Sequence, residues 1–348
     1  MKKEYHVVGG MAGSSMDGLD LVWVQFLEKD GNWEFEVKKS KTIEYPAMLF
    51  KKLHDAANDS DKFQHELDEE FGVWIGARIK EFLASKKVDL LAIHGHTVVH
   101  DPASARSWQL GSGASIAKVT RTTTVTRFRD EDVKLGGQGA PLVPFGDFHL
   151  FADYDACLNL GGIANISFKR NQQAGDICPC NQVLNYYASQ LGLPFDRGGA
   201  LAREGHLDQP FFERLMAIPY FRSDFPKSLA NGFLTREVLD MVEPKTGLRT
   251  YVSFIAKQVA SCLKRIEGVD KKLLVSGGGT FNTFLIEEIK QNLPKWNVIL
   301  PSDTIVNFKE AIIFGFLGLK KQLEQVNVLS SVTGALHDTS SGVIHLPE

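Results

Sequence analysis

Two glycine-rich loops, each lying between a pair of strands, constrain the fold of this chain more than any other feature. The first loop, Gly9–Gly18, separates an extended run from a strand rich in Val, Trp and Phe. The second contains Gly161 and Gly162 and joins the predicted strands Ala156–Leu160 and Ile163–Phe168. Glycine between two short apolar runs is typical of a hairpin turn. Because this pattern opens each half of the chain, it predicts two units built in a similar way.

Alternating helices and strands follow both loops. Apolar side chains at Leu67, Phe71, Ile75 and Ile79 recur at helical spacing. A strand meander followed by such alternation predicts an α/β fold with two mixed lobes and a cleft between them. The further expected elements are strands over Trp33–Tyr45, Val88–His94 and Leu273–Ser276 and helices over Ala47–Ala57, Phe63–Ser85, Val183–Leu191 and Tyr251–Ile266.

The length and charge of the chain agree with this organisation. A chain of 348 residues is long enough for two lobes. We place them at 1–150 and 151–348, with the alternative that the last helices cross back to the first lobe. A net charge of -3 gives no electrostatic reason to expect nucleic acid or an anionic membrane as partner. The chain shows no signal peptide and no apolar run long enough to span a bilayer, so we expect a cytoplasmic protein.

The first loop has the composition of a phosphate-binding hairpin. Its glycines let the backbone approach a phosphate closely, and its serines add hydroxyl donors. Asp17 and Asp20 are candidate ligands of a magnesium ion, directly or through water. The alternative is a plain hairpin turn, in which Gly, Ser and Asp are common. The candidate ATP-binding residues here are Gly13, Ser14, Ser15, Met16, Asp17, Gly18, Leu19 and Asp20.

Two further loops complete the predicted nucleotide site. Gly161 and Gly162 mirror the first loop in the second lobe, and two such hairpins facing each other across a cleft would hold a polyphosphate from both sides. Gly277, Gly278 and Gly279 lie between a strand and a helix, where they leave room for a flat adenine ring, with Asn282 close behind. The alternative for these glycines is a tight turn between strand and helix. The chain contains no P-loop motif.

A fourth group of residues predicts a sugar site. His96, Thr97, Gln138 and Gly139 are candidates for contacts with sugar hydroxyls or an acyl amide. The histidines of 94–100 also allow a metal site, although only Asp101 supplies a nearby carboxylate. The four cysteines do not have the paired spacing of a zinc site, so we expect reduced thiols without metal, with a redox switch as the alternative for the closely spaced pair. They are Cys157, Cys178, Cys180 and Cys262.

Motifs along nearly the whole chain resemble those of anhydro-N-acetylmuramic acid kinases. Gly136–Pro144 matches their GGQGAPLVP letter for letter, and Asn159–Asn165 matches NLGGIAN. Gly10–Asp20 resembles their GxMSGTSxDGxD opening. Further matches are His94–Val98 with HGQTV, Pro226–Ser228 with the PKS of PPKSTG, Gly277–Asn282 with GGGxxN, Glu310 and Ala311 with EA, and Val332–Ala335 with VTGA.

The resemblance implies a fold and an activity. Members of this family have two ribonuclease-H-like lobes of the actin-like ATPase type. They hydrolyse the ring of 1,6-anhydro-N-acetylmuramic acid and phosphorylate its 6-oxygen with ATP and Mg²⁺, during recycling of cell-wall murein. A carboxylate must activate the attacking water, and by resemblance that base is Asp176. The resemblance also makes Asn181 a substrate contact and Glu310 a residue that orients the water. A homodimer is a possible assembly.

The sequence departs from the family pattern where the chemistry is expected. The family's DTGPGN is Asp176–Asn181 here, with Cys178 and Cys180 in place of both glycines. The family's DFR is Arg127–Arg129, so that a base replaces an acid, and HGQTV has become His94-Gly-His96-Thr-Val. Two hypotheses follow. One is an active kinase, and the other is a weak or inactive relative that binds nucleotide or amino sugar as a regulatory or partner module.

Overall fold

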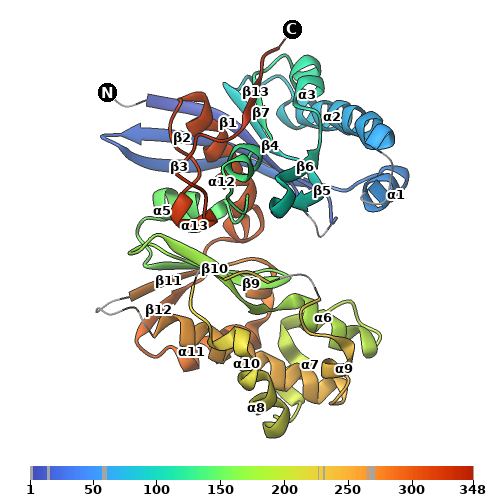
Figure 1. The fold of residues 1–348 in the computed structure, drawn as a ribbon, viewed down its shortest axis with the longest axis vertical. Coiled ribbons are helices and arrows are strands. Elements are labelled where there is room, and N and C mark those ends of the chain that lie inside the picture. Colours follow the sequence, from blue (N-terminus) through green and yellow to red (C-terminus); the bar gives the residue numbers. More distant parts are fainter. Residues whose placement is uncertain are drawn as a thin grey trace. The chain divides into compact units, whose positions relative to one another are not determined.

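The computed structural model describes residues 3–13, 16–56, 61–225, 227–229, 232–264, 266 and 271–347, without the side chains of 61–63. The chain divides into two compact units (Figure 1). The first unit comprises Met1–Leu150 and Phe308–Glu348, and the second comprises Phe151–Asn307. Each unit is described by itself. Among the described residues, we find no helix with the length and apolar character needed to cross a bilayer.

A six-stranded mixed sheet forms the centre of the first unit, in the order β13-β7-β4-β1-β2-β3. The meander β1–β2–β3 is antiparallel. Strand β4 pairs in parallel with β1, and β7 pairs in parallel with β4. Strand β13 pairs antiparallel with β7. A separate two-stranded sheet joins β5 and β6. The strands are β1 (Lys3–Ala12), β2 (Leu19–Lys29), β3 (Asn32–Ile43), β4 (Leu90–His94), β5 (His96–Asp101), β6 (Arg106–Leu110), β7 (Thr124–Thr126) and β13 (Val343–His345).

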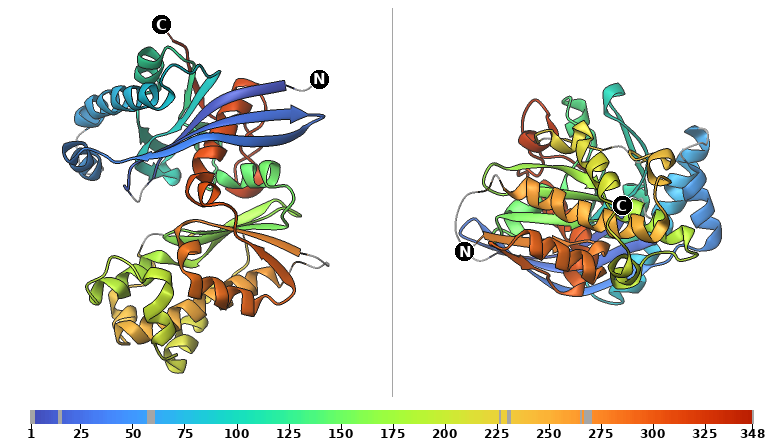
Figure 2. Two further views of the ribbon diagram at one scale, coloured as in Figure 1. Left: turned by 180° about the vertical axis from the view of Figure 1, so that it is seen from behind. Right: turned by 90° about the horizontal axis from the view of Figure 1, so that it is seen from below.

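Helices cover both faces of this sheet (Figures 1 and 2). On one face, α1 (Ala47–Asp55), α2 (Asp61–Leu83) and α3 (Gly113–Thr120) cover an apolar core that includes Val8. On the other face, α12 (Asp303–Gln322) packs directly on β1, because a Cβ atom at Gly9 would lie 1.9 Å from the carbonyl oxygen of Ala311. Shorter helices complete the unit, namely α4 (Asp130–Lys134), α5 (Val143–Leu150) and α13 (Ser330–Thr333).

The second unit is a five-stranded sheet with helices packed against it. Its strand order is β10-β9-β8-β11-β12, with an antiparallel meander β8–β9–β10 followed by the parallel strands β11 and β12. The central α10 packs against α6, α7, α8 and α11. The elements are β8 (Ala156–Leu160), β9 (Ile163–Phe168), β10 (Gln173–Pro179), α6 (Asn181–Gln190), α7 (Ala200–Glu204), α8 (Gln209–Ala217), α9 (Arg236–Leu239), α10 (Pro244–Leu263), β11 (Lys271–Ser276), α11 (Thr283–Asn292) and β12 (Trp296–Ile299).

Apart from the edge strand β13 of the first unit, the two units therefore share one strand order, a three-strand meander extended by two parallel strands from its first strand. This is the order of a ribonuclease-H-like lobe, so the α/β fold class is confirmed. The division into domains at 1–150 and 151–348 stays a prediction, to which the structure adds that Phe308–Glu348 packs with the first unit. In the first half, β4 ends at His94 and His96 begins β5, a strand of another sheet.

Candidate active site

The loop between β1 and β2 is held by close packing of its last glycine. Met16 donates its backbone N–H to the Gly13 carbonyl at 3.2 Å and has a positive φ of 59°. A Cβ atom at Gly18 would lie 2.6 Å from the carbonyl oxygen of Ile43, so a side chain does not fit there. Ser14 and Ser15, predicted to contact phosphate, lie outside the described residues.

The two candidate magnesium ligands have different surroundings. Asp17 is exposed, whereas Asp20 is half-buried and accepts a hydrogen bond from the Thr42 hydroxyl at 2.5 Å. Burial raises the pKa of Asp20, the Thr42 bond lowers it, and the negative charge of Asp17 raises it again. A bound cation would relieve this repulsion. Leu19 between them is fully buried, so its side chain is not available to a ligand.

Glu310 lies on α12 beside a buried ion pair. Its side chain is exposed. Desolvation by surrounding protein raises the pKa of Glu310, while the positive charges of Lys309 and Arg129 lower it and the charge of Asp20 raises it. Lys309 itself is buried and pairs with Asp147 at 2.8 Å. The charges of Asp20 and Arg129 thus both act on Glu310 within the first unit.

Arg129 joins two of the predicted sugar-site segments. Its Nε donates to Nε2 of His94 at 3.0 Å, and its Nη1 donates to the carbonyl of Gly139. Burial is the main cause that holds the pKa of His94 well below its usual value, and the positive charge of Arg129 is the second. Since Nε2 is the acceptor, we assign the proton of the neutral ring to Nδ1. Burial lowers the pKa of Arg129 to about 10, so the guanidinium stays charged at neutral pH.

His96 and Thr97 occupy the start of β5. The His96 ring is buried and has a hydrogen bond with the backbone of Leu53, and burial lowers its pKa. Thr97 is half-buried and pairs with Gln109 across the hairpin. His96 is therefore a neutral side chain packed beside α1, and His94 points to Arg129. Within the described part of the chain, no group of histidine, cysteine and carboxylate side chains forms a metal site.

Asp132, which the sequence reasoning missed, organises the segment around Gln138 and Gly139. Its buried carboxylate accepts from the Thr333 hydroxyl at 2.6 Å and from the Gly139 N–H at 2.7 Å. A Cβ atom at Gly137 would lie 2.2 Å from this carboxylate. The backbone N–H of Gln138 also donates to the Thr333 carbonyl at 2.9 Å, and the Gln138 side chain is exposed. The sequence signal that could have identified Asp132 is an acidic residue a few positions before a run of glycines.

Asp176, the candidate general base, lies on β10 in the second unit. One carboxylate oxygen, Oδ2, accepts both from the Leu229 backbone N–H at 2.8 Å and from the Ser228 hydroxyl at 3.3 Å. The Tyr220 hydroxyl donates to the Asp176 carbonyl at 2.9 Å. Burial raises the pKa of Asp176, against the lowering effect of the two bonds to Leu229 and Ser228. A carboxylate with a raised pKa is a better general base near neutral pH.

The residues that replace the family's loop glycines point into the core. Cys178 and Cys180 are fully buried free thiols, and burial raises the pKa of Cys180 to about 12. Neither has a positive φ. Backbone N–H groups of Cys180 and Asn181 donate to the carbonyls of Gly162 and Gly161, at 2.7 and 3.1 Å. The glycine hairpin therefore caps the start of α6.

The third glycine loop packs on the second. A Cβ atom at Gly277 would lie 2.4 Å from Oδ1 of Asn159, and one at Gly279 would lie 2.6 Å from the Leu160 side chain. Gly278 is exposed. Asn282 is the N-cap of α11 and accepts from the Leu285 N–H at 3.0 Å, while Asn181 donates to the Leu160 carbonyl at 2.9 Å. The structure thus brings the loops at 161–162 and 277–279 together with Asn181.

Two units of this strand order, each with glycine loops at its strand ends, define the fold class of this protein as the actin-like ATPase type. The sequence profile of anhydro-N-acetylmuramic acid kinase matches residues 5–347. The chain belongs to the anhydro-N-acetylmuramic acid kinase family. It is therefore a phosphotransferase with an alcohol group as acceptor, in amino-sugar metabolism.

Individual relatives agree with the family profile. The anhydro-N-acetylmuramic acid kinase of Saccharophagus degradans is 31% identical and that of Shewanella baltica 32% identical, each over 98% of this chain and 98% of the relative. Among solved structures, component A of the (R)-2-hydroxyglutaryl-CoA dehydratase of Acidaminococcus fermentans aligns with 92% of this chain and 99% of that chain, with a TM-score of 0.47 and 12% identity.

Proposed function

We propose that this protein hydrolyses the ring of 1,6-anhydro-N-acetylmuramic acid and phosphorylates the freed 6-oxygen with ATP and Mg²⁺, as a step in murein recycling. The observation that carries the proposal is the setting of Asp176. Its Oδ2 is held by Ser228 and the backbone of Leu229, and burial raises its pKa. This setting fixes the carboxylate and increases its basicity, as activation of water requires.

The remaining residues of the proposed site have supporting roles. Phosphoryl transfer needs positioning and neutralisation of charge more than covalent chemistry. We assign backbone contacts with ATP phosphates to Gly13–Gly18 and to Gly161 and Gly162, and the adenosine contact to Gly277–Gly279. Asp17 and Asp20 are suited to Mg²⁺, because both are carboxylates and the charge of Asp17 acts unfavourably on that of Asp20.

The acceptor contacts and the assembly belong to the same proposal. We assign the amino sugar to His96, Thr97, Gln138, Gly139 and Asn181. Glu310, as the second carboxylate, orients the water. The cytoplasmic location and the homodimer stay predictions.

The altered Asp176–Asn181 segment argues against the inactive alternative. A side chain introduced in place of glycine blocks a site only if it points toward the ligand or requires a strained backbone. Cys178 and Cys180 are both fully buried, and neither has a positive φ. The substitutions therefore change the core of the second unit, and neither side chain is exposed beside Asp176.

The test compares wild type with Asp176→Asn in a coupled assay of ADP release, with and without the anhydro sugar. Loss of a general base lowers the rate by roughly 100- to 10,000-fold, while ATP affinity, measured by calorimetry, stays unchanged. Asp208→Asn is the matched control, since Asp208 caps α8 by accepting from Phe211 at 2.7 Å and asparagine caps about as well. An inactive wild type selects the binding-module alternative. An Asp176→Asn variant with more than about a tenth of the rate removes Asp176 as the base.

A further inference from the structure

A cavity of about 510 Å³ lies within the first unit, outside the glycine loops. Its walls come from α2, from the β5–β6 hairpin, and from the segment Arg127–Lys134 that includes α4. The volume is within the range of small-molecule sites. Val99 of β5 lines the cavity, so it adjoins the strand that carries His96 and Thr97.

The cavity has an excess of positive side chains. Arg106, Arg127 and Lys134 line it, against the carboxylates of Asp68 and Asp130. Arg127 donates its Nε to Oδ2 of Asp130 at 2.5 Å, and the Arg127 side chain is 49% exposed while that of Asp130 is 13% exposed. This bond fixes the plane of the guanidinium through Nε, and the two Nη groups remain as donors for an anion.

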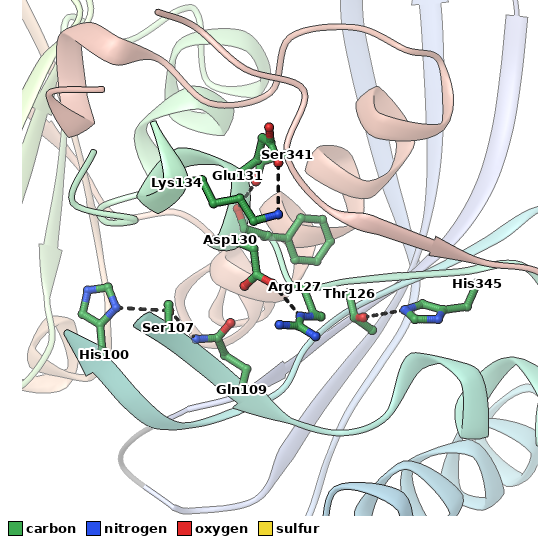
Figure 3. A network of polar contacts seen from close by, with 11 residues as sticks. His100, Ser107, Gln109, Thr126, Arg127, Asp130, Glu131, Lys134, Ser341 and His345 are labelled. Carbon is green, nitrogen blue, oxygen red and sulfur yellow. Dashed lines mark hydrogen bonds and ion pairs between the residues drawn. The ribbon is translucent and has the colours of Figure 1, made fainter. Parts of the chain in front are cut away.

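A buried acceptor lies beside these donors. Within the described residues, Oδ1 of Asp130, which lines the cavity, is buried and has no hydrogen-bond partner, and the same holds for Oε1 of Gln109, which does not itself line the cavity. The Gln109 amide nitrogen donates to the Ser107 hydroxyl at 2.9 Å (Figure 3). A buried acceptor without a hydrogen-bond partner is unfavourable, so Oδ1 of Asp130 favours a ligand that brings a donor. Hydroxyl groups are such donors.

An aromatic pair supplies an apolar wall. The rings of His65 and Trp108 lie with centroids 4.8 Å apart, and both residues line the cavity. Aromatic side chains in a small-molecule site present an apolar face to a ring while polar groups fix its orientation. The cavity thus combines a surface for a ring, an acceptor for a hydroxyl group and cations for an acid.

We propose that this cavity binds a small, hydroxyl-bearing anion of the sugar-phosphate or sugar-acid class. The acidic group binds Arg127, with Arg106 and Lys134 beside it. Arg127 occupies the position of an acidic residue in the family motif that this segment resembles, so the anion preference is a property of this chain. The inference concerns binding alone and does not depend on turnover of ATP.

Calorimetry at low salt, without ATP, tests the proposal with glucose 6-phosphate, gluconate, glucose and inorganic phosphate. Because charge-assisted hydrogen bonds are about twice as strong as neutral ones, at least one anionic sugar should bind about tenfold or more tightly than glucose. If gluconate binds more tightly, the acidic group that the cavity prefers is a carboxylate. If glucose 6-phosphate binds more tightly, that group is a phosphoryl group. Equal binding of glucose and both anionic sugars, or no binding of either anion at about 20 mM, overturns the proposal.

Variants locate the binding. Arg127→Asp should weaken the preferred anion by about tenfold or more, and Arg106→Gln, which leaves the Arg127–Asp130 pair intact, by a smaller factor. Arg170→Gln, an exposed arginine of the second unit, is the control and should bind as wild type does. Thermal melting confirms that each variant is folded. Unchanged affinity in both cavity variants overturns the assignment, and a kinase that proves inactive but binds the anion leaves it supported.

Discussion

The two units share a strand order but support their loops in different ways. In the first unit, buried charges hold the segments together, as in the Lys309–Asp147 pair and the bonds of Asp132. In the second unit, neutral groups support the glycine loops, as in the Asn282 cap of α11 and the carbonyls of Gly161 and Gly162 at the start of α6, while the carboxylates of Asp176 and Asp208 hold other segments. The glycine segments of the two units are therefore supported by ionic contacts in the first unit and by neutral contacts in the second, and the two kinds of contact should respond differently to mutation and pH.

Breaking the buried ion pair should have the largest effect on stability. Lys309→Met leaves the Asp147 carboxylate buried without its cation, which typically costs about 3–5 kcal/mol of unfolding free energy. Asp147→Asn in the Lys309→Met background removes the uncompensated charge and should recover most of this loss. Denaturant unfolding measures both. The exposed pair Lys245–Glu204 of the second unit is the matched control, and Lys245→Met should change little. A small effect of Lys309→Met would contradict the comparison.

Acid should weaken the first unit through its histidines. The histidines with lowered pKa values are His94, His96, His100, His149 and His345, all in the first unit. A histidine whose folded pKa is lowered takes up a proton more readily when unfolded, so its contribution to stability is lost as pH falls below the unfolded value of 6.5.

His94→Gln isolates this effect, because the glutamine oxygen accepts from Arg129 and does not titrate. Below pH ~6.5, wild type should lose up to about 1.4 kcal/mol per pH unit relative to the variant. Denaturant unfolding at several pH values measures the difference. Parallel curves for the two proteins would exclude His94 as a source of acid sensitivity.

Removing a neutral cap should have the smallest effect. Asn282→Ala takes away the side-chain acceptor of the Leu285 N–H, at a cost of about 1 kcal/mol. Asn282→Asp keeps the cap and should stay within a few tenths of wild type. Thermal unfolding distinguishes the two. If Asn282→Ala lowers ATP affinity while stability is unchanged, Asn282 acts on the nucleotide and not as a cap.

Local patterns predicted much of the fold. The strands at 156–160 and 163–168 have the predicted bounds, and the helix over 61–83 lies within two residues of the expected range. Strand β10 was missed because Asp176–Asn181 was interpreted through its motif, and β5 because Gly95 separates it from β4 by a single residue. Hairpins β5–β6 and β9–β10 depend on pairing partners that periodicity does not reveal.

Only those parts of the candidate site that consist of residues close together in the sequence could be predicted. The glycine loops were recognised because their composition is local. Asp132 and Lys309 were missed because their partners lie far away in the sequence, at Thr333 and Asp147. A buried charge looks like any surface charge until the fold brings its partner to it. The proposed roles of Asp176 and Glu310 came from resemblance and stay predictions.

The Asp132–Thr333 hydrogen bond also bears on how this protein is made. The bond joins positions 201 residues apart, and β13 pairs with β7 over a similar span. Residues 151–307 of the second unit are contiguous, so a ribosome releases them as one block. The segment around Gly139 and the sheet of the first unit can be completed only after Thr333 and β13 have been synthesised. Although residues 1–150 are translated first, we expect the first unit to be the last part of the nascent chain to finish folding.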